Sequence, residues 1–313
     1  MTNIPNIFIS QETDPFFNLA VEHYLLENHE HSEPVLFIYR STPCVVLGRN
    51  QNPWLECNVP ECQKRNINVC RRISGGGTVY HDLGNTNFCF ITPRNQYDPD
   101  LHLQIVVNAL KDFSINAGIT ERHDLEFDGA KISGTAFRLT NKSALQHGTL
   151  LLNADLNVLR SVLESDDSGI NSHAVKSIKS PVRNIQSINT EINHDSVTRS
   201  LVQSFRTQAK PERAGEFRFD KNQHMFAGLN QYREKLADWQ WIFGHTPPFS
   251  QTLTIDEDKN YLYTVKVEKG VIKEVQPESS ALQKEQDTFE KIKNKLIGQY
   301  FNRSYVKLGR TSS

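Results

Sequence analysis

The pattern of apolar positions along the first two thirds of the chain predicts short strands interleaved with helices. Runs rich in β-branched and aromatic residues are typical of strands, and they occur at 7–9, 35–39, 44–47, 69–71, 78–81, 87–92 and 149–152. The runs at 35–39 and 44–47 are expected to be neighbouring strands, because only a short Ser-Thr-Pro turn separates them. Asp14 and Pro15 suit the cap and first turn of a helix. Further helices are expected at 103–113, which should cover the sheet, at 156–163 and at 194–208.

Two connections in the middle of the chain have contrasting patterns. Asp128 and Gly129 stand between apolar positions and predict a tight hairpin, which places Lys131 at the start of the second hairpin strand. The segment from Ser165 to Arg183 is rich in Ser, Asp and Lys and shows little periodicity. It is expected to be a long mobile loop.

The last quarter of the chain follows an aromatic cluster and the pair Pro247 and Pro248, which together indicate a boundary. Beyond it, strands are expected at 253–255, 261–267 and 271–275, and a helix at 281–296. We therefore expect a main domain over residues 1–247 and a small α+β accessory domain over residues 248–313. Because strands and helices do not alternate strictly, the sequence favours an α+β core with a mixed or largely antiparallel sheet.

Composition and charge narrow the class of protein. The 313 residues include 37% hydrophobic residues, enough for a core, and no apolar run approaches the length of a membrane span. The formal net charge of −1 argues against a general affinity for nucleic acid. Residues 1–33 contain no Arg and no apolar signal core, so neither secretion nor a retained mitochondrial presequence is supported. The five cysteines lack metal-site spacing and are expected to be free thiols in a reducing compartment.

The segment from Arg71 to Asp82 carries the strongest chemical signal, because it contains Arg71, Arg72 and then three consecutive glycines. Glycines let successive backbone N–H groups converge on an anion, and the arginines add positive charge. The segment could therefore cradle a carboxylate or a phosphate, or it could be an ordinary glycine-rich turn. It lacks the Lys-Ser or Lys-Thr ending of a P-loop and the spacing of a dinucleotide fingerprint.

Two further segments supply candidate charged groups. Lys131 is followed by Ile-Ser-Gly-Thr-Ala, small residues that would let a ligand or backbone approach the ammonium group. Taken alone, it could equally be a solvated lysine at a strand end. His147 precedes a Gly-Thr-Leu-Leu-Leu run that is expected to be a buried strand, and His147 itself could be a structural histidine.

Together and in this order, these segments resemble the lipoate-protein ligase A and lipoyltransferase family. Supporting matches are Asn18 to Glu22 in the first helix, Gly48 to Asn58, and Trp239 to Gly244. The resemblance covers the chain from about Ile7 to Ser250 and is weak beyond. The glycine triplet combined with the Lys-Ile-Ser-Gly segment is highly specific, whereas neither piece is specific alone.

The resemblance implies a catalytic domain of the biotin and lipoate ligase fold, with a mixed sheet and flanking helices, followed by a small C-terminal α+β domain. In that family, lipoate and ATP react to lipoyl-adenylate and pyrophosphate, and the lipoyl group then passes to a lysine of a carrier domain. The implied carriers are the lipoyl domains of 2-oxoacid dehydrogenase E2 subunits and the glycine cleavage H protein. Mg²⁺ is expected to accompany ATP, coordinated mainly by phosphate oxygens and water. No protein metal ligand is expected, and the enzyme is expected to be a monomer.

The resemblance also implies site residues. Lys131 would be the catalytic group that contacts both the lipoyl carbonyl and the α-phosphate. The nucleotide would be held by Lys131 together with Arg72, Gly75, Gly76, Gly77, Thr78, Val79 and Tyr80. The lipoyl group would be bound by Glu22, Tyr39, Ser74, His81, Asn87 and His147. The family often has Trp at the position of Tyr39.

Three rival functions fit the same residues. The nearest is a lipoyltransferase that uses preformed lipoyl-adenylate or another activated acyl donor. An octanoyltransferase with a cysteine acyl-enzyme is more distant, because no cysteine lies in the Lys131 or His147 segments. A non-catalytic protein that binds lipoate or a carrier domain is the rival of a different class. The missing presequence favours a bacterial cytoplasm, whereas a processed eukaryotic enzyme would belong in the mitochondrial matrix.

Overall fold

A computed structural model describes residues 6–28, 33–165, 169–211, 215–222, 226–254, 262–278 and 286–302. The helices are α1 (Pro15–Asn28), α2 (Pro53–Glu56), α3 (Val59–Lys64), α4 (Pro99–Lys111), α5 (Leu156–Leu163), α6 (His194–Ala209), α7 (Leu229–Ala237) and α8 (Gln286–Leu296). Short 3₁₀ turns lie at Arg94–Gln96 and Ile185–Ser187, and a short π-helix lies at Gln240–Gly244.

The largest sheet is mixed and has six strands in the order β10-β11-β6-β2-β1-β13. Its strands are β1 (Ile7–Ser10), β2 (Val35–Tyr39), β6 (Asn85–Pro93), β10 (Thr135–Leu139), β11 (Ser143–Leu151) and β13 (Glu216–Phe219). The β10, β11, β6 and β2 strands pair antiparallel, whereas β1 runs parallel to both of its neighbours. Buried apolar residues on both faces explain why this sheet needs helices on each side.

Three smaller sheets complete the fold. The first has the order β4-β3-β5, the second β7-β8-β9 and the third β12-β14-β15-β16. Their strands are β3 (Cys44–Leu47), β4 (Asn68–Arg71), β5 (Val79–His81), β7 (Gly118–Ile119), β8 (Leu125–Phe127), β9 (Ala130–Ser133), β12 (Ile170–Ser172), β14 (Phe249–Thr254), β15 (Leu262–Glu268) and β16 (Val271–Pro277).

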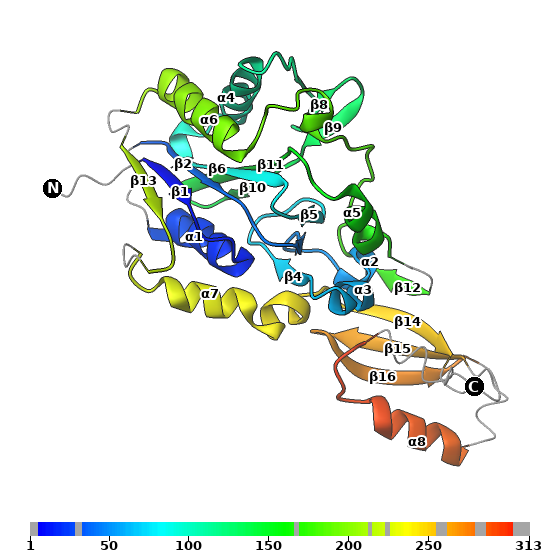
Figure 1. Ribbon diagram of the computed structural model, residues 1–313. Helices are drawn as coiled ribbons and strands as arrows, with labels where there is room; N and C mark the ends of the chain where they lie inside the picture. The colour runs from blue at the N-terminus through cyan, green and yellow to red at the C-terminus, as the bar shows by residue number, and fades with distance from the viewer. Residues whose placement is uncertain are drawn as a thin grey trace.

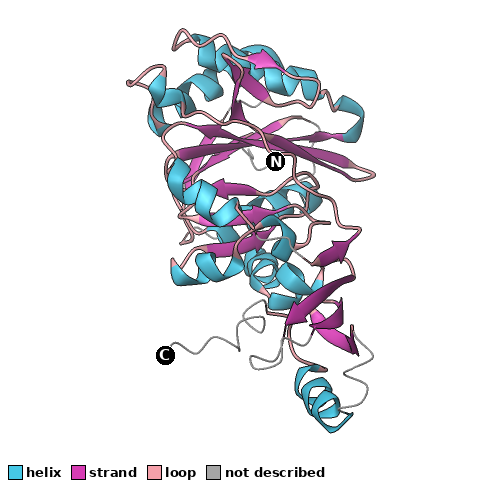
Figure 2. Ribbon diagram, turned by 90° about the vertical axis from the view of Figure 1, so that its right-hand side faces the viewer, coloured by secondary structure: helices cyan, strands magenta, loops and turns pink. Residues whose placement is uncertain are grey.

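Helices cover both faces of the large sheet (Figures 1 and 2). The α4 and α6 helices pack on one face and share a core cluster with Ile7, Leu36 and Phe88. The α1 and α7 helices pack on the opposite face, in a second cluster that includes Phe8 and Phe37. This second face, with α1 and the β4-β3-β5 sheet, carries the functional site described below.

The structure confirms most of the predicted elements and corrects one pairing. The strands predicted at 35–39 and 44–47 form, but they are not neighbours, because β2 lies in the large sheet and β3 pairs with β4 and β5. The hairpin at Asp128 and Gly129 forms with both residues at positive φ, and Lys131 is the second residue of β9. The expected free thiols are confirmed, because all five cysteines are buried and unpaired.

The C-terminal sheet is joined to the rest of the chain in two ways. The β12 strand, which comes from the polar segment after α5, pairs antiparallel with β14. A third core cluster combines Val45 and Trp54 with Phe249 and Tyr263 from the C-terminal sheet. The division into a domain over 1–247 and one over 248–313 stays a prediction, and residues 281–285 of the predicted last helix lie outside the described part.

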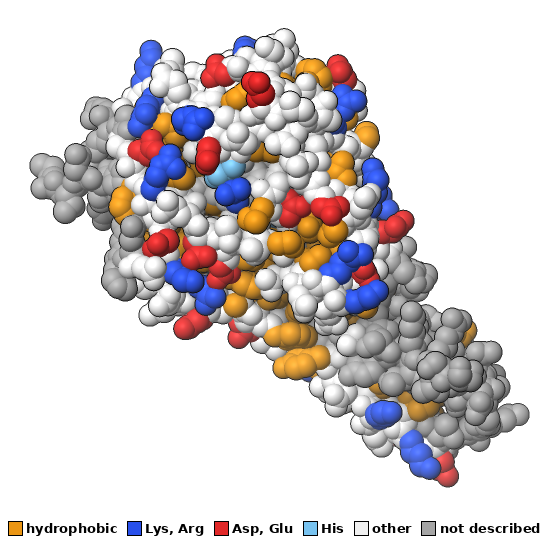
Figure 3. All heavy atoms as spheres, in the orientation of Figure 1, with side chains coloured by type: hydrophobic (Ala, Val, Ile, Leu, Met, Phe, Trp, Pro, Cys, Tyr) orange, Lys and Arg blue, Asp and Glu red, His pale blue; other side chains and the backbone are white. Residues whose placement is uncertain are grey.

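The distribution of charged side chains on the surface and the lengths and polarity of the helices agree with the composition. Basic and acidic side chains are interspersed over the face drawn in Figure 3, as the net charge of −1 leads one to expect. Within the described residues, every helix is too short or too polar to cross a membrane.

Candidate active site

One cavity of about 430 Å³ brings together the segments that the sequence singles out. Its lining comes from α1, from the β4-β3-β5 sheet with the glycine loop, from the β8-β9 hairpin and from β10 and β11. The lining residues shared with the sequence prediction are Tyr39, Arg72, Gly75, Gly76, Gly77, Thr78, Val79, His81, Lys131 and His147. The topology therefore places a glycine loop, an ammonium group and an apolar wall around a single space.

The loop favours glycine at Gly76 and leaves little room for a side chain at Gly77. Gly76 has a φ of +81°, which disfavours a residue with a side chain. At Gly77, an added Cβ would lie 3.1 Å from the Ser177 hydroxyl. Not all of the loop amides point to open space, because Gly75 N–H donates to Phe137 O at 3.4 Å and Thr78 N–H donates to Ser177 Oγ at 2.8 Å.

Arg72 holds the shape of this loop from beneath. Its Nη2 donates to Gly75 O at 2.6 Å and to Gly77 O at 2.7 Å, and its Nη1 donates to Val46 O at 3.0 Å. The side chain is almost fully buried, and this burial lowers the pKa of Arg72 to about 10, against the opposing effect of the Glu22 carboxylate. Most of its donors are thus used within the protein. Its predicted contact with nucleotide remains a prediction.

Lys131 projects into the cavity from β9. Its Nζ lies 2.9 Å from Asp124 Oδ1, and Asp124 is also 3.5 Å from the Arg122 guanidinium. Gly134 gives the lysine room, because a Cβ there would lie 2.8 Å from Lys131 Cε. The Lys131 side chain is 20% exposed and paired with Asp124, so its ammonium group has a fixed position at the cavity and is not fully solvated.

A further part of the lining, from α1, β2, β3, β5 and β11, is buried and includes Leu19 and Val46. We call it the apolar side: Leu19, Tyr39, Val46, His81 and Thr149. The exposed fraction of Leu19, Val46 and His81 is 5% or less. Burial raises the pKa of the Tyr39 phenol well above its usual range, and the nearby Glu22 carboxylate adds to this effect. Tyr39 is therefore an uncharged ring under all ordinary conditions.

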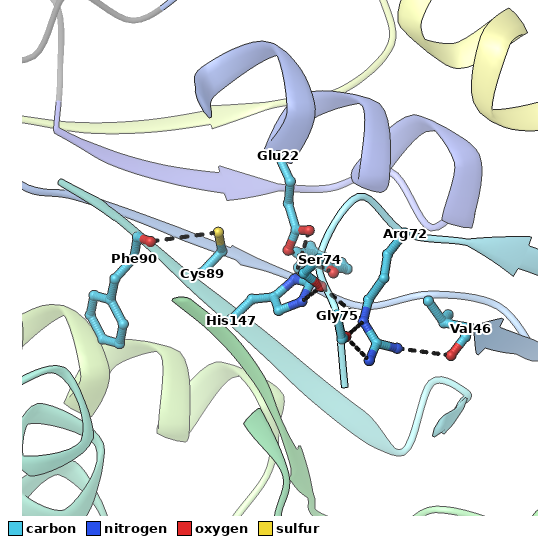
Figure 4. A network of polar contacts seen from close by, with 9 residues as sticks. Glu22, Val46, Arg72, Ser74, Gly75, Cys89, Phe90 and His147 are labelled. Carbon is cyan, nitrogen blue, oxygen red and sulfur yellow. Dashed lines mark hydrogen bonds and ion pairs between the residues drawn. The ribbon is translucent and has the colours of Figure 1, made fainter. Parts of the chain in front are cut away.

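A chain of buried hydrogen bonds connects the two parts of the cavity (Figure 4). The Tyr39 hydroxyl donates to Glu22 Oε1 at 3.0 Å, and Glu22 Oε2 lies 2.8 Å from His147 Nδ1. His147 Nε2 lies 2.7 Å from Ser74 Oγ, which accepts from Arg72 Nε at 2.9 Å. These contacts join residues far apart in the sequence, from α1, β2, the glycine loop and β11.

The segment after β12 lies across the glycine loop. Ser177 Oγ accepts from Thr78 N–H at 2.8 Å and from Gln51 Nε2 at 3.0 Å, and it also contacts the Glu56 carboxylate. Ser177 N–H donates to Glu56 at 3.2 Å. Val175 to Ile178 line the cavity in this arrangement. The predicted mobile loop thus includes a short strand and a docked turn, and its residues 166–168 lie outside the described part.

Four predicted site residues do not line the cavity. Glu22 and Ser74 belong to the buried chain behind it, and Tyr80 packs in the third core cluster. Asn87 on β6 is 1% exposed, and it pairs with Tyr39 of β2 on one side and with Thr149 of β11 on the other. Its side-chain amide has no hydrogen-bond partner among the described residues. Their predicted roles in binding stay predictions.

Sequence reasoning assigned no role to several residues at the site. Gln51 is fully buried, and its Oε1 accepts from Gly48 N–H at 2.8 Å and from the Thr78 hydroxyl at 2.7 Å. Glu56 and Ser177 dock the covering segment on the loop. Gln51 and Glu56 could have been found from the sequence, because both lie in the Gly48 to Asn58 segment that resembles the family. The signal for Ser177 was absent, because nothing local to its polar segment indicates where it docks.

Two other kinds of chemistry find little support in the described residues. Among them, no cysteine lines the cavity; Cys44 is buried in the second core cluster, where a hydrogen bond with Cys70 lowers the pKa of its thiol to about 6. No group of three His, Cys, Asp or Glu side chains within the described ranges could hold a metal ion.

The fold and the cavity define an α+β domain in which a glycine loop and a lysine line the same cavity as several buried apolar residues. Residues 14–206 match the family described as the lipoyl protein ligase A/B catalytic domain. The chain therefore belongs to this family, and the expected family and fold are confirmed.

Curated relatives agree with this assignment. A lipoate-protein ligase A from Psychrobacter cryohalolentis is 36% identical over 78% of this chain and 74% of its own length. One from Bdellovibrio bacteriovorus is 35% identical over 86% of this chain and 81% of its own length. The expected enzyme class, a ligase, is confirmed by these relatives.

Solved structures show the same fold. P. falciparum LipL1, crystallised in complex with lipoate, superposes with a TM-score of 0.68 at 26% identity, over 98% of this chain and 94% of that one. A lipoate-protein ligase A bound with ATP superposes with a TM-score of 0.62 at 22% identity, over 76% of this chain and 96% of that one.

Proposed function

We propose that this protein activates lipoate with ATP to form lipoyl-adenylate and pyrophosphate, and then transfers the lipoyl group to a lysine of a carrier protein. The observation that carries the proposal is the single cavity, in which Lys131 and the glycine loop face the same space as the apolar side. Relatives named lipoate-protein ligase A and a similar structure with bound lipoate support it.

In the first step, a lipoate carboxylate oxygen attacks the α-phosphorus of ATP, and pyrophosphate leaves. Two anions must approach one another, and charge spreads over the phosphate oxygens. Lys131 supplies a fixed positive charge, and the N–H groups of Gly76 and Gly77, which line the cavity, are the loop donors proposed to contact the phosphate. Arg72 contributes by holding the carbonyls of Gly75 and Gly77.

In the second step, the neutral amine of the carrier lysine attacks the lipoyl carbonyl, the bond from the carbonyl carbon to the phosphate oxygen breaks so that AMP leaves with the electron pair, and the nitrogen releases one proton to solvent. The mixed anhydride is already activated, so no protein nucleophile is needed. Lys131 can stabilise the negative charge that develops on the carbonyl oxygen. The same ammonium group thus serves both steps.

Mg²⁺ fits this site only as a partner of the nucleotide. Mg²⁺ commonly binds through substrate phosphates, waters and one or two carboxylates. Asp124 is the nearest carboxylate to the Lys131 ammonium, but it is already paired with Lys131 and Arg122. When bound, the ion would neutralise phosphate charge, while the protein contributes the loop and the lysine.

The carriers are proposed to be lipoyl domains of 2-oxoacid dehydrogenase E2 subunits and the glycine cleavage H protein. A similar archaeal structure is described as a bi-partite lipoate protein ligase and its E2 lipoyl domain from Thermoplasma acidophilum. The curated relatives above come from bacteria, which favours a bacterial cytoplasm as the site of action.

Pyrophosphate exchange tests the proposal directly. The purified full chain is incubated with ATP, Mg²⁺ and labelled pyrophosphate, with and without lipoate. A ligase incorporates label into ATP only when lipoate is present. An enzyme that transfers lipoyl from synthetic lipoyl-adenylate to a carrier, yet shows no lipoate-dependent exchange, would instead be a transferase. A protein that does neither would be a binding protein.

A further inference from the structure

With Glu22 as a carboxylate and a neutral His147 ring, the hydrogen-bond chain behind the cavity runs in one direction. An ionised carboxylate can only accept, so Glu22 requires that His147 carries its proton on Nδ1. In the neutral ring, Nε2 then accepts, and the Ser74 hydroxyl must donate to it. Ser74 Oγ also accepts from Arg72 Nε at 2.9 Å. With the Nε2–H tautomer, Ser74 Oγ would instead accept from both His147 and Arg72, and the Ser74 proton would lose His147 as its acceptor.

The end of this chain is the glycine loop. Arg72 Nη2 donates to the carbonyls of Gly75 and Gly77, on either side of the residue with positive φ. A guanidinium has a planar, fixed arrangement of donors, so the orientation of Nε restricts where Nη2 points. Nε donates to Ser74 Oγ at 2.9 Å and to Gly75 O at 3.2 Å, so Ser74 supplies the shorter of the two contacts that orient the group shaping the loop.

Because these side chains are buried, the position of Arg72 is expected to depend on the Glu22 carboxylate. The exposed fractions of Glu22, Ser74 and Arg72 are 1%, 0% and 4%. Water cannot replace a lost partner at these depths, so each lost bond leaves a buried polar group unsatisfied. Glu22 does not line the cavity, whereas His147 does. A role for Glu22 must therefore pass through its neighbours.

We propose that Glu22 is a positioning residue for the nucleotide: its carboxylate fixes the Nδ1–H tautomer of His147, and His147 and Ser74 then orient Arg72 and the glycine loop. This proposal deepens the proposed function and rests on it, because it assigns the nucleotide to that loop. It reassigns Glu22 from the acyl group, where the resemblance places it, to the other substrate.

The test compares two variants that each remove one partner of the chain near Glu22. Glu22→Ala removes the acceptor for His147, whereas Tyr39→Phe removes the other hydrogen bond to the same carboxylate and leaves His147 in place. Two-bond ¹H–¹⁵N spectra of the ligand-free full chain report the tautomer, with the His147 signal assigned by its loss in His147→Gln. Titration calorimetry reports the Kd for ATP.

Wild type and Tyr39→Phe should both show the Nδ1–H tautomer, and their Kd values for ATP should agree within about twofold. Glu22→Ala should show a large fraction of the Nε2–H form, and its Kd for ATP should rise about tenfold, the size of one hydrogen bond to a charged group. A folded Glu22→Ala with the wild-type tautomer, or with wild-type ATP affinity, would overturn the proposal.

Ser74→Ala keeps the test decisive where Glu22→Ala fails to fold. It breaks the chain beyond His147, so the Nδ1–H tautomer should remain while the Kd for ATP rises by a similar factor. Unchanged ATP affinity in Ser74→Ala would count against the chain. The tautomer of the wild-type His147 ring is measured without turnover, and an Nε2–H ring would contradict the positioning role of Glu22. A lack of lipoate-dependent pyrophosphate exchange would contradict only the proposed ligase function.

Discussion

The two sides of the cavity are built in different ways. The apolar side consists of residues on strands and on α1, held by the large sheet and by the β4-β3-β5 sheet. The side that carries Lys131 consists of a hairpin, the glycine loop and the segment around Ser177, joined mainly by polar contacts. Val175 and Ile178 on that segment are 51% and 67% exposed, against 1% for Val46.

This difference suits two substrates with different needs. An acyl chain is bound by burial of apolar surface, which a rigid wall provides at little entropic cost. A triphosphate needs directed donors and must reach a site from which pyrophosphate can leave, which loops permit. The division predicts that changes on one side affect one substrate and spare the other.

The largest effect is expected at Lys131. In Lys131→Ala, the formation of lipoyl-adenylate should slow by about 10²-fold or more, because a held charge that stabilises the transition state is removed. The measurement is single-turnover formation of lipoyl-adenylate in rapid-quench experiments. Lys142→Ala, which removes an exposed lysine from the turn before β11, is the control and should react at the wild-type rate. Near-normal adenylation by Lys131→Ala would defeat the assignment.

An intermediate effect is expected when the apolar side is narrowed. Val46→Phe adds a ring to the wall of the cavity and should raise KM for lipoate about tenfold, with ATP affinity unchanged. Val45→Phe adds the same ring to the opposite face of β3, in the third core cluster. Both variants should lose stability in urea unfolding, but only Val46→Phe should alter KM for lipoate. Equal increases in KM for lipoate and for ATP in Val46→Phe would contradict the division of the cavity into two sides.

The smallest effect is expected where the covering segment meets the loop. Ser177→Ala removes the oxygen that accepts from Thr78 N–H, so the segment should loosen and trypsin should cleave at Lys176 and Lys179 about fivefold faster. Ser180→Ala, in the same segment, is the matched control. Bound lipoyl-adenylate should slow cleavage of the wild-type segment. Cleavage at one rate with and without it would contradict a covering role.

The sequence predicts local features of this molecule well. The hairpin at Asp128 and Gly129, the helix after Asp14 and the glycine loop each follow from neighbouring residues, and the structure contains all three. The α7 helix went unpredicted because only Leu229 and Leu236 of its nine residues are buried. Its polar sequence gives little periodic signal.

Features that depend on distant contacts were not predictable from pattern. The separation of β2 and β3 into different sheets is decided by their partners β6 and β4, which lie elsewhere in the chain. The resemblance supplied Glu22 and His147, but their contact across 125 positions appears only in three dimensions. Arg72 lines the cavity, and its contact with nucleotide stays a prediction; the bonds from its guanidinium to the Gly75 and Gly77 carbonyls could not be foreseen from the local sequence.

The segment over the cavity is anchored at both ends. Its beginning pairs with β14 through β12, and its end is held by backbone hydrogen bonds between Lys131 and both Pro181 and Arg183. Because one anchor is the backbone of the lysine itself, we expect any movement of this segment to be coupled to the position of the ammonium group, while β14 of the C-terminal sheet holds the other end.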